Sequence, residues 1–119
     1  MLNLDTHMLI YALVNDLKPR ERKLLESHPW SLSAIVLWEL AKLSQLKRIE
    51  LDFEDVDVRR ILSQIHIWPI SYDVCRQIRH LDFKSDPADE LIAATSIVYN
   101  IPLLTRDRKI KRSKQVPFP

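Results

Sequence analysis

The 119-residue sequence contains no glycine, and this absence excludes two common kinds of phosphate-binding site. A Walker loop and a GxGxxG turn both need glycine, because their backbones bend sharply and approach the phosphate closely. Nucleotide binding of either kind is therefore excluded.

Cysteine and histidine are scarce and scattered. The only cysteine, Cys75, cannot form an internal disulfide, which suits a reducing compartment, and we expect it to be a small buried side chain on a helix rather than a nucleophile. The four histidines form neither an HExxH pair nor a cluster with Cys75, so we expect no zinc site; they are His7, His28, His66 and His80.

Long hydrophobic runs are also absent. No apolar stretch approaches the roughly 18 to 20 residues of a membrane-spanning helix. The N-terminal stretch MLNLDTHMLIYALV has no basic leader and no small-residue cleavage site, so we expect no signal peptide. These features predict a cytoplasmic protein without a membrane partner.

The composition is that of one globular domain covering residues 1–119, with 46% hydrophobic and 29% charged residues. The net charge of +2 predicts no strong overall attraction to nucleic acid. Its distribution is uneven, because six basic residues and one acid lie between Arg106 and Lys114.

Short apolar stretches alternate with helical patterns along the chain, which predicts parallel strands joined by helices. The expected fold is an α/β sheet of four to five strands, mainly parallel, between layers of helices. The strands are expected at Met1–Asp5, Trp30–Leu32, Ile67–Ile70, Ile101–Thr105 and, as a candidate last strand, Val116–Pro119. Helices are expected at Thr6–Val14, Pro19–Ser27 and Ala34–Leu46, from the acidic stretch Leu51–Asp57 to about Ile65, at Tyr72–Leu81, from Pro87 to Tyr99, and briefly within Arg106–Lys114.

The stretch SDPADELIAATSIVY, residues 85–99, combines a helix start with an apolar face. Asp86 precedes Pro87, so Asp86 is expected at the N-cap and Pro87 at the first helical position. Asp89 then lies in the first turn and off the apolar face.

Four acids are expected to meet at one edge of the sheet. Asp5, Asp89 and Asp107 each lie at a helix start, and the carboxyl ends of parallel strands share an edge. Glu39 is the single charge in the apolar helix AIVLWELA. Each acid alone is explained as a cap, a dipole partner or an ion pair with Lys42. Together they would repel one another unless a cation such as Mg²⁺ or Mn²⁺ neutralised them.

Four segments, in order, resemble the acidic motifs of the PIN-domain nucleases: LNLDTHMLIYAL, AIVLWELAKL, SDPADELIAAT and IPLLTRDRKI. The VapC-type toxins of bacterial toxin–antitoxin pairs are the most similar members. The resemblance implies a three-layer PIN-like fold and catalytic, metal-binding roles for four acids: Asp5, Glu39, Asp89 and Asp107. It also implies that the hydroxyls of Thr6 and Thr105 support the site and that Asp86 is a neighbouring acid.

The same resemblance implies an activity and partners. The activity would be Mg²⁺- or Mn²⁺-dependent endonucleolytic hydrolysis of RNA by a toxin that a VapB-like antitoxin inhibits, and the toxin would be a homodimer. The basic stretch would hold the RNA backbone through Arg106, Arg108, Lys109, Lys111 and Arg112. Two positions depart from the family: Glu90 stands where an arginine is usual, and Asn100 where many members have glycine.

Three other classes of α/β protein are alternatives: two match the sequence less well, and one remains open. A haloacid-type phosphatase needs a second acid at position 7, which is His7, and a receiver domain needs an acidic pair where this chain has only Asn3 and Asp5. A non-catalytic α/β binding module, with its acids serving only as helix caps, stays open. That module predicts no stabilisation by divalent metal, whereas a nuclease predicts a higher melting temperature.

Overall fold

A parallel four-stranded sheet, in the order β3-β2-β1-β4, forms the centre of the computed structural model, which describes residues 1–119. Every neighbouring pair is parallel, with Leu4 opposite both Leu32 and Leu104. The strands are short: β1 is Leu2–Leu4, β2 Trp30–Ser33, β3 His66–Trp68 and β4 Leu103–Leu104.

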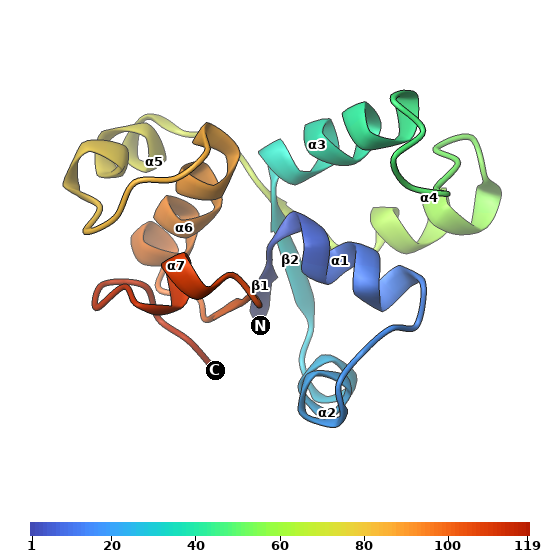
Figure 1. Ribbon diagram of the computed structural model, residues 1–119, viewed down its shortest axis with the longest axis horizontal. Coiled ribbons are helices and arrows are strands. Elements are labelled where there is room, and N and C mark those ends of the chain that lie inside the picture. The colour runs from blue at the N-terminus through green and yellow to red at the C-terminus, as the bar shows by residue number, and fades with distance from the viewer.

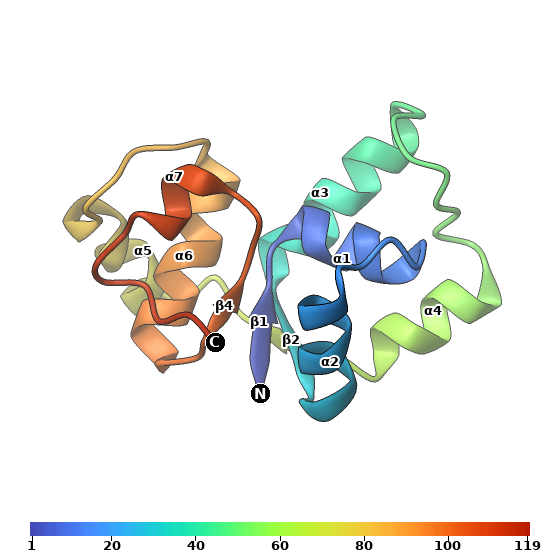
Figure 2. The ribbon, with the colours of Figure 1, turned by 60° about the horizontal axis from the view of Figure 1, so that its bottom comes forward.

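Helices cover both faces of this sheet (Figures 1 and 2). Helices α5, α6 and α7 gather on one side, α1, α2 and α4 lie on the other, and α3 runs on from the carboxyl end of β2. This confirms the three-layer α/β/α architecture. The helices are α1 Thr6–Leu13, α2 Pro19–Ser27, α3 Ala34–Gln45, α4 Val56–Ser63, α5 Tyr72–Gln77, α6 Pro87–Tyr99 and α7 Arg108–Lys111, with a 3₁₀ turn at Ile78–His80.

The core lies on both faces of the central strand β1, as expected for a parallel sheet covered by helices. All three residues of β1 are buried, and Met8 and Leu9 of α1 join the same core. Asn3 donates from Nδ2 to the Ile92 carbonyl (3.4 Å) and to Ser96 Oγ (2.9 Å), which ties β1 to α6. None of the helices is long and apolar enough to cross a membrane.

Proline limits two of the predicted strands. The candidate strand Val116–Pro119 does not form, because Pro117 and Pro119 have no N–H for a ladder. The Pro117 carbonyl still accepts a hydrogen bond from Leu103 N of β4 at 2.8 Å. Strand β3 ends at Trp68, before Pro69, instead of continuing to position 70. It is an edge strand, as Pro69 predicts.

Two further predictions needed correction. The helix expected within Leu51–Ile65 begins only at Val56, because Asp55 caps it by accepting from Asp57 N (2.7 Å) and Val58 N (3.4 Å). Cys75 is exposed, not buried, since the short helix α5 buries only Val74.

The order of the strands locates a crevice at the carboxyl edge of the sheet. From β1 the chain proceeds outward to β2 and β3, and β4 then pairs on the other side of β1. Ligands in open parallel sheets bind where the strand order reverses in this way. Here that point lies between the carboxyl ends of β1 and β4.

Candidate functional site

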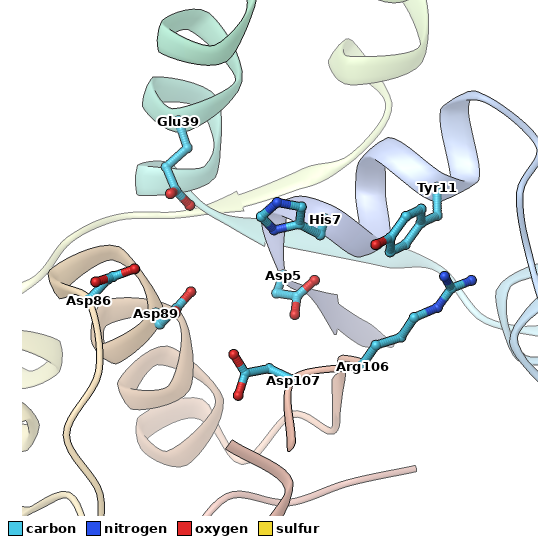
Figure 3. Close-up of a pocket in the computed structure, with 8 residues that line it drawn as sticks. All are labelled: Asp5, His7, Tyr11, Glu39, Asp86, Asp89, Arg106 and Asp107. Carbon is cyan, nitrogen blue, oxygen red and sulfur yellow. The ribbon is translucent and has the colours of Figure 1, made fainter. Parts of the chain in front are cut away.

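A pocket of about 380 Å³ opens at this edge of the sheet (Figure 3). Its lining comes from residues far apart in the sequence, brought together by β1, α1, α3, α6 and the segment after β4. Five of its eight lining residues are carboxylates: Asp5, Glu39, Asp86, Asp89 and Asp107, joined by His7, Tyr11 and Arg106. The structure therefore brings together all four acids that the sequence singled out.

Asp5 lies directly after β1 and caps helix α1. Its Oδ1 accepts from Met8 N at 2.8 Å, and its Oδ2 accepts from the Thr105 hydroxyl. Asp5 is 7% exposed, and burial raises its pKa above the ordinary value, although these two hydrogen bonds oppose the shift. The charge of Asp89 raises the pKa further.

Thr105 links the first and last of the four acids. While its hydroxyl donates to Asp5, its oxygen accepts from Asp107 N at 3.0 Å. Asp107 in turn caps α7, where its Oδ1 accepts from Ile110 N at 3.0 Å. One buried threonine thus fixes the relative positions of the loops that carry Asp5 and Asp107.

Glu39 approaches the pocket from α3 and is held by a second threonine. The Thr6 hydroxyl donates to Glu39 Oε1, which joins the start of α1 to the first turns of α3. Thr6 itself is buried, whereas Glu39 is only partly so. The carboxylate of Glu39 is accordingly directed towards the pocket (Figure 3).

Asp89 lies in the first turn of α6, opposite Asp5. Its Oδ2 accepts from Ser85 Oγ at 3.0 Å. Partial burial raises the pKa of Asp89, the Ser85 hydrogen bond opposes this, and the charges of Asp107 and Asp86 raise the pKa further. Burial and mutual repulsion therefore act together against the ionised form of this acid.

Asp86 occupies the predicted N-cap position of α6, but its side chain makes no capping hydrogen bond. The side chain lines the pocket instead. Glu90 contributes to the helix start, because its Oε2 accepts from Ser85 N at 3.1 Å. Glu90 is not among the residues that line the pocket, so the acid that replaces the usual arginine does not add to the charge of the pocket wall.

Arg106 lines the pocket but is held by a buried acid from α2. Its Nε and Nη2 donate to Glu21 Oε2 and Oε1 at 2.8 and 2.7 Å, and Nη2 also donates to the Asp16 carbonyl at 2.9 Å. The guanidinium carbon lies 3.9 Å from the centre of the Tyr11 ring. The two partners shift each other's pKa: that of Glu21 is lowered and that of Arg106 raised.

The other predicted RNA-contacting residues lie outside the pocket. They are exposed on or beside α7 and comprise Arg108, Lys109, Lys111 and Arg112. Of the basic stretch, only Arg106 lines the pocket.

Four residues at the site were not predicted from the sequence. His7 and Tyr11 are separated by one helical turn on α1, so the helical periodicity after Asp5 would have placed both beside it. Ser85 immediately precedes the predicted cap and would have been found as a local hydroxyl. Glu21 had no comparable signal, because its partner lies 85 positions away.

The donor set of the pocket is that of a hard divalent cation. Its candidate ligands are carboxylate oxygens, which Mg²⁺ and Mn²⁺ prefer. Burial and neighbouring negative charge raise the pKa values of two of them, Asp5 and Asp89. A bound cation would offset that negative charge and favour the ionised carboxylates. As they stand, no three His, Cys, Asp or Glu side chains are close enough together to hold a metal ion.

The chain matches the PIN domain family over residues 3–115. Among solved structures, it is similar to VapBC2 from Rickettsia felis bound to a DNA fragment from its promoter, with a TM-score of 0.75 and 22% identity over 100% of this chain and 98% of that one. It is also similar to a toxin–antitoxin complex from Klebsiella pneumoniae, with a TM-score of 0.71 and 23% identity over 94% and 91% of the two chains.

A third similar structure is FitAcB from Neisseria gonorrhoeae, with a TM-score of 0.70 and 25% identity over 100% of this chain and 97% of that one. The search of curated proteins found no match. The structural similarities extend over nearly the whole chain and agree with the family match. The chain is therefore a member of the PIN-domain family.

Proposed function

We propose that this protein is a metal-dependent endoribonuclease and the toxin of a VapBC-type toxin–antitoxin pair. The observation that carries this proposal is the pocket of five carboxylates at the point where the strand order reverses. The one guanidinium beside them, that of Arg106, is already paired with Glu21 and does not neutralise them. Family membership supports the same reading.

In this proposal Asp5, Glu39, Asp89 and Asp107 hold Mg²⁺ or Mn²⁺. A bound divalent cation would supply the positive charge that activates water and stabilises negative charge developing on the phosphoryl oxygens.

The protein's own contribution is to orient these acids. Thr105 fixes Asp5 relative to Asp107, and Thr6 fixes Glu39. Because Asp5 is buried and accepts two hydrogen bonds, its carboxylate is preorganised and loses little freedom when it binds a cation. Ser85 gives Asp89 a similar but more exposed support.

The RNA backbone would be held around the pocket by Arg106 and along α7 by Arg108, Lys109, Lys111 and Arg112. These last four side chains are exposed, so they are free to contact phosphates outside the pocket. Contacts of this kind predict binding that weakens with rising salt.

The proposed protein partners are a VapB-like antitoxin and a second copy of the chain. Two of the similar structures reported above are described as VapBC2 and as a toxin–antitoxin complex, which supports the antitoxin. Large apolar side chains exposed on the single chain, among them Trp38 (57%), Leu46 (57%) and Tyr72 (79%), support protein–protein contacts. The single thiol suits the cytoplasm as the site of action.

A non-catalytic binding module is the second candidate, since Asp5 and Asp107 do act as helix caps. Capping does not account for Asp89 or Glu39, however. Neither accepts a hydrogen bond from a helix N–H, yet both line the pocket.

The test is cleavage of a panel of structured and single-stranded RNAs, with a matched DNA panel, by protein purified free of any antitoxin. We expect RNA cleavage with Mg²⁺ or Mn²⁺ and none with EDTA. Asp89→Asn should lower the rate by about 100-fold or more, because it removes a charged ligand from the site.

Asp55→Asn is the matched control. It makes the same chemical change at an exposed cap that lies outside the pocket, and asparagine caps as well as aspartate. Cleavage that survives EDTA, or that Asp89→Asn leaves at the level of Asp55→Asn, contradicts the proposal. Cleavage of DNA alone contradicts the assignment of RNA.

A further inference from the structure

Arg106 and Glu21 form a contact that the acidic site does not itself require. Glu21 lies in the first turn of α2, 85 positions before Arg106, and is 7% exposed. Its Oε1 also accepts from Lys18 N at 2.8 Å, so the carboxylate is fixed to the start of its own helix. It is therefore a rigid acceptor for the arginine.

The hydrogen bonds leave one end of the guanidinium free. Nε and Nη2 are occupied by Glu21 and the Asp16 carbonyl, whereas Nη1 donates to no protein atom. Tyr11 covers one face of the guanidinium at 3.9 Å from the ring centre. The side chain of Arg106 is still 25% exposed and lines the pocket. Its remaining donors are thus held in one orientation.

The position of this group within the pocket indicates what it can contact. In Figure 3, Glu39, Asp86 and Asp89 lie on one wall, while Tyr11 and the Arg106 guanidinium lie on the other. A phosphate held among the acids would therefore be separated from Arg106 by the width of the pocket. The next phosphate of the same strand is the group that the free Nη1 donors suit, because guanidinium donors match phosphate oxygens.

We propose that Glu21 is a positioning residue for RNA binding, which acts by orienting Arg106 towards a phosphate adjacent to the one that is cleaved. The inference rests on the proposed nuclease function. Glu21 itself touches no RNA, and Arg106 makes a contact that is the same before and during cleavage. Loss of either residue should then raise KM and leave kcat nearly unchanged.

The experiment measures kcat and KM for an RNA that the wild type cleaves, with Glu21→Gln, Arg106→Ala and the double variant. Glutamine keeps the size of the side chain and one acceptor oxygen, but it loses the negative charge and the second carboxylate oxygen that Arg106 binds. We expect KM to rise about tenfold for Arg106→Ala and about three- to tenfold for Glu21→Gln. The double variant should match Arg106→Ala, because Glu21 acts only through Arg106.

Salt dependence gives a second readout that a purely structural role would not change. Arg106→Ala should make the slope of log(1/KM) against log[salt] shallower by about 0.7, the value for one phosphate contact on a single strand. Glu26→Gln is the matched control: it is the same substitution on the same helix at an exposed position. It should leave both KM and this slope unchanged.

All variants are assayed below the melting temperature of the least stable one, and Glu21→Asp replaces Glu21→Gln if the latter does not fold. If Glu21→Gln lowers the melting temperature but keeps the wild-type KM, the pair is only a structural link and the inference is wrong. A fall in kcat with unchanged KM also overturns it. If the wild type cleaves no RNA with Mg²⁺ or Mn²⁺, the proposed function has failed instead.

Discussion

Asp5 and Glu21 are equally buried acids whose surroundings shift their pKa values in opposite directions. Each is 7% exposed. Burial raises the pKa of Asp5, whereas two hydrogen bonds from Arg106 lower that of Glu21. Asp5 accepts only from an amide and a hydroxyl and has Asp89 as a charged neighbour.

This difference separates an acid whose charge is compensated by a cation of the chain from an acid whose charge is not. Glu21 has its own cation, so the buried charge is compensated within the chain. Asp5 and Asp89 have no ion-paired cation of this kind, and neighbouring carboxylates raise the pKa of both, although the charge of His7 opposes this in part. Partly buried carboxylates without a paired cation lower the stability of the fold. Such a loss of stability is typical of a site whose charge is balanced by a bound ligand.

Removing the cation from Glu21 is expected to have the largest effect on stability. Arg106→Ala leaves the Glu21 carboxylate without its cation, with the hydrogen bond from Lys18 N as its one remaining partner, and should lower the free energy of unfolding by about 3 kcal/mol. Urea denaturation at pH 7 measures this. Arg112→Ala, an exposed arginine beyond α7, is the control and should change it by less than about 0.5 kcal/mol. Equal effects would mean that Glu21 and Arg106 are not an energetically important pair.

Lowering the pH should remove the same stabilisation, because it protonates the Glu21 carboxylate. The pKa of Glu21 is lower in the folded chain than its ordinary value of 4.5. Its stabilising effect is therefore fully present above pH 4.5 and is lost as the pH falls through the folded-state pKa. The difference in unfolding free energy between wild type and Glu21→Gln should shrink as the pH falls below 4.5. A difference that stays constant in acid would show that charge does not matter at this position.

Neutralising Asp5 should not lower the free energy of unfolding, in contrast to neutralising Glu21. In metal-free buffer Asp5→Asn removes an uncompensated buried charge and keeps the cap on α1, since asparagine also accepts from Met8 N. We expect the free energy of unfolding to stay the same or rise by up to about 1 kcal/mol, in contrast to the loss in Glu21→Gln. Denaturation with EDTA present measures both variants. A clear loss in Asp5→Asn would show that the Asp5 carboxylate stabilises the fold, as we expect of the Glu21 carboxylate.

The smallest effect is expected at Asp86. Its side chain makes no capping hydrogen bond, and it is exposed at the edge of the pocket. Asp86→Asn should change stability by less than about 0.5 kcal/mol and should leave most of the cleavage rate, whereas Asp89→Asn should lower that rate by about 100-fold or more. Melting curves and cleavage assays of the two variants side by side test this. Equal loss of cleavage in both would make Asp86 a member of the metal site.

The sequence was sufficient to predict the sheet and the four acids, because both depend on local patterns. Apolar runs mark β1 and β4, with Asp5 directly after the first and Asp107 three residues after the second, and the topology of a parallel sheet then brings their carboxyl ends together. The position of Asp89 in the first turn of α6 could be predicted because Pro87 determines where that helix begins. Glu39 was recognised as a lone charge in an apolar helix.

The errors arose where a single residue outweighed a pattern, or where the contact was distant. Pro117 and Pro119 prevented a fifth strand, and Asp55 delayed the start of α4. The partner of Arg106 could not be predicted, since nothing local to Glu21 indicates a contact 85 positions away. The basic stretch therefore appeared uniform in the sequence, although the structure separates Arg106 from the rest.

The central claim is that the acids of the pocket require a divalent cation, and the melting temperature of the wild type as Mn²⁺ or Mg²⁺ is added tests it most directly. At a concentration 100 times the dissociation constant, binding stabilises the fold by about 2.7 kcal/mol, or about 10 °C. We predict such a rise for the wild type and for Asp55→Asn, and little or none for Asp89→Asn. No rise in the wild type, or an equal rise in Asp89→Asn, would contradict the account.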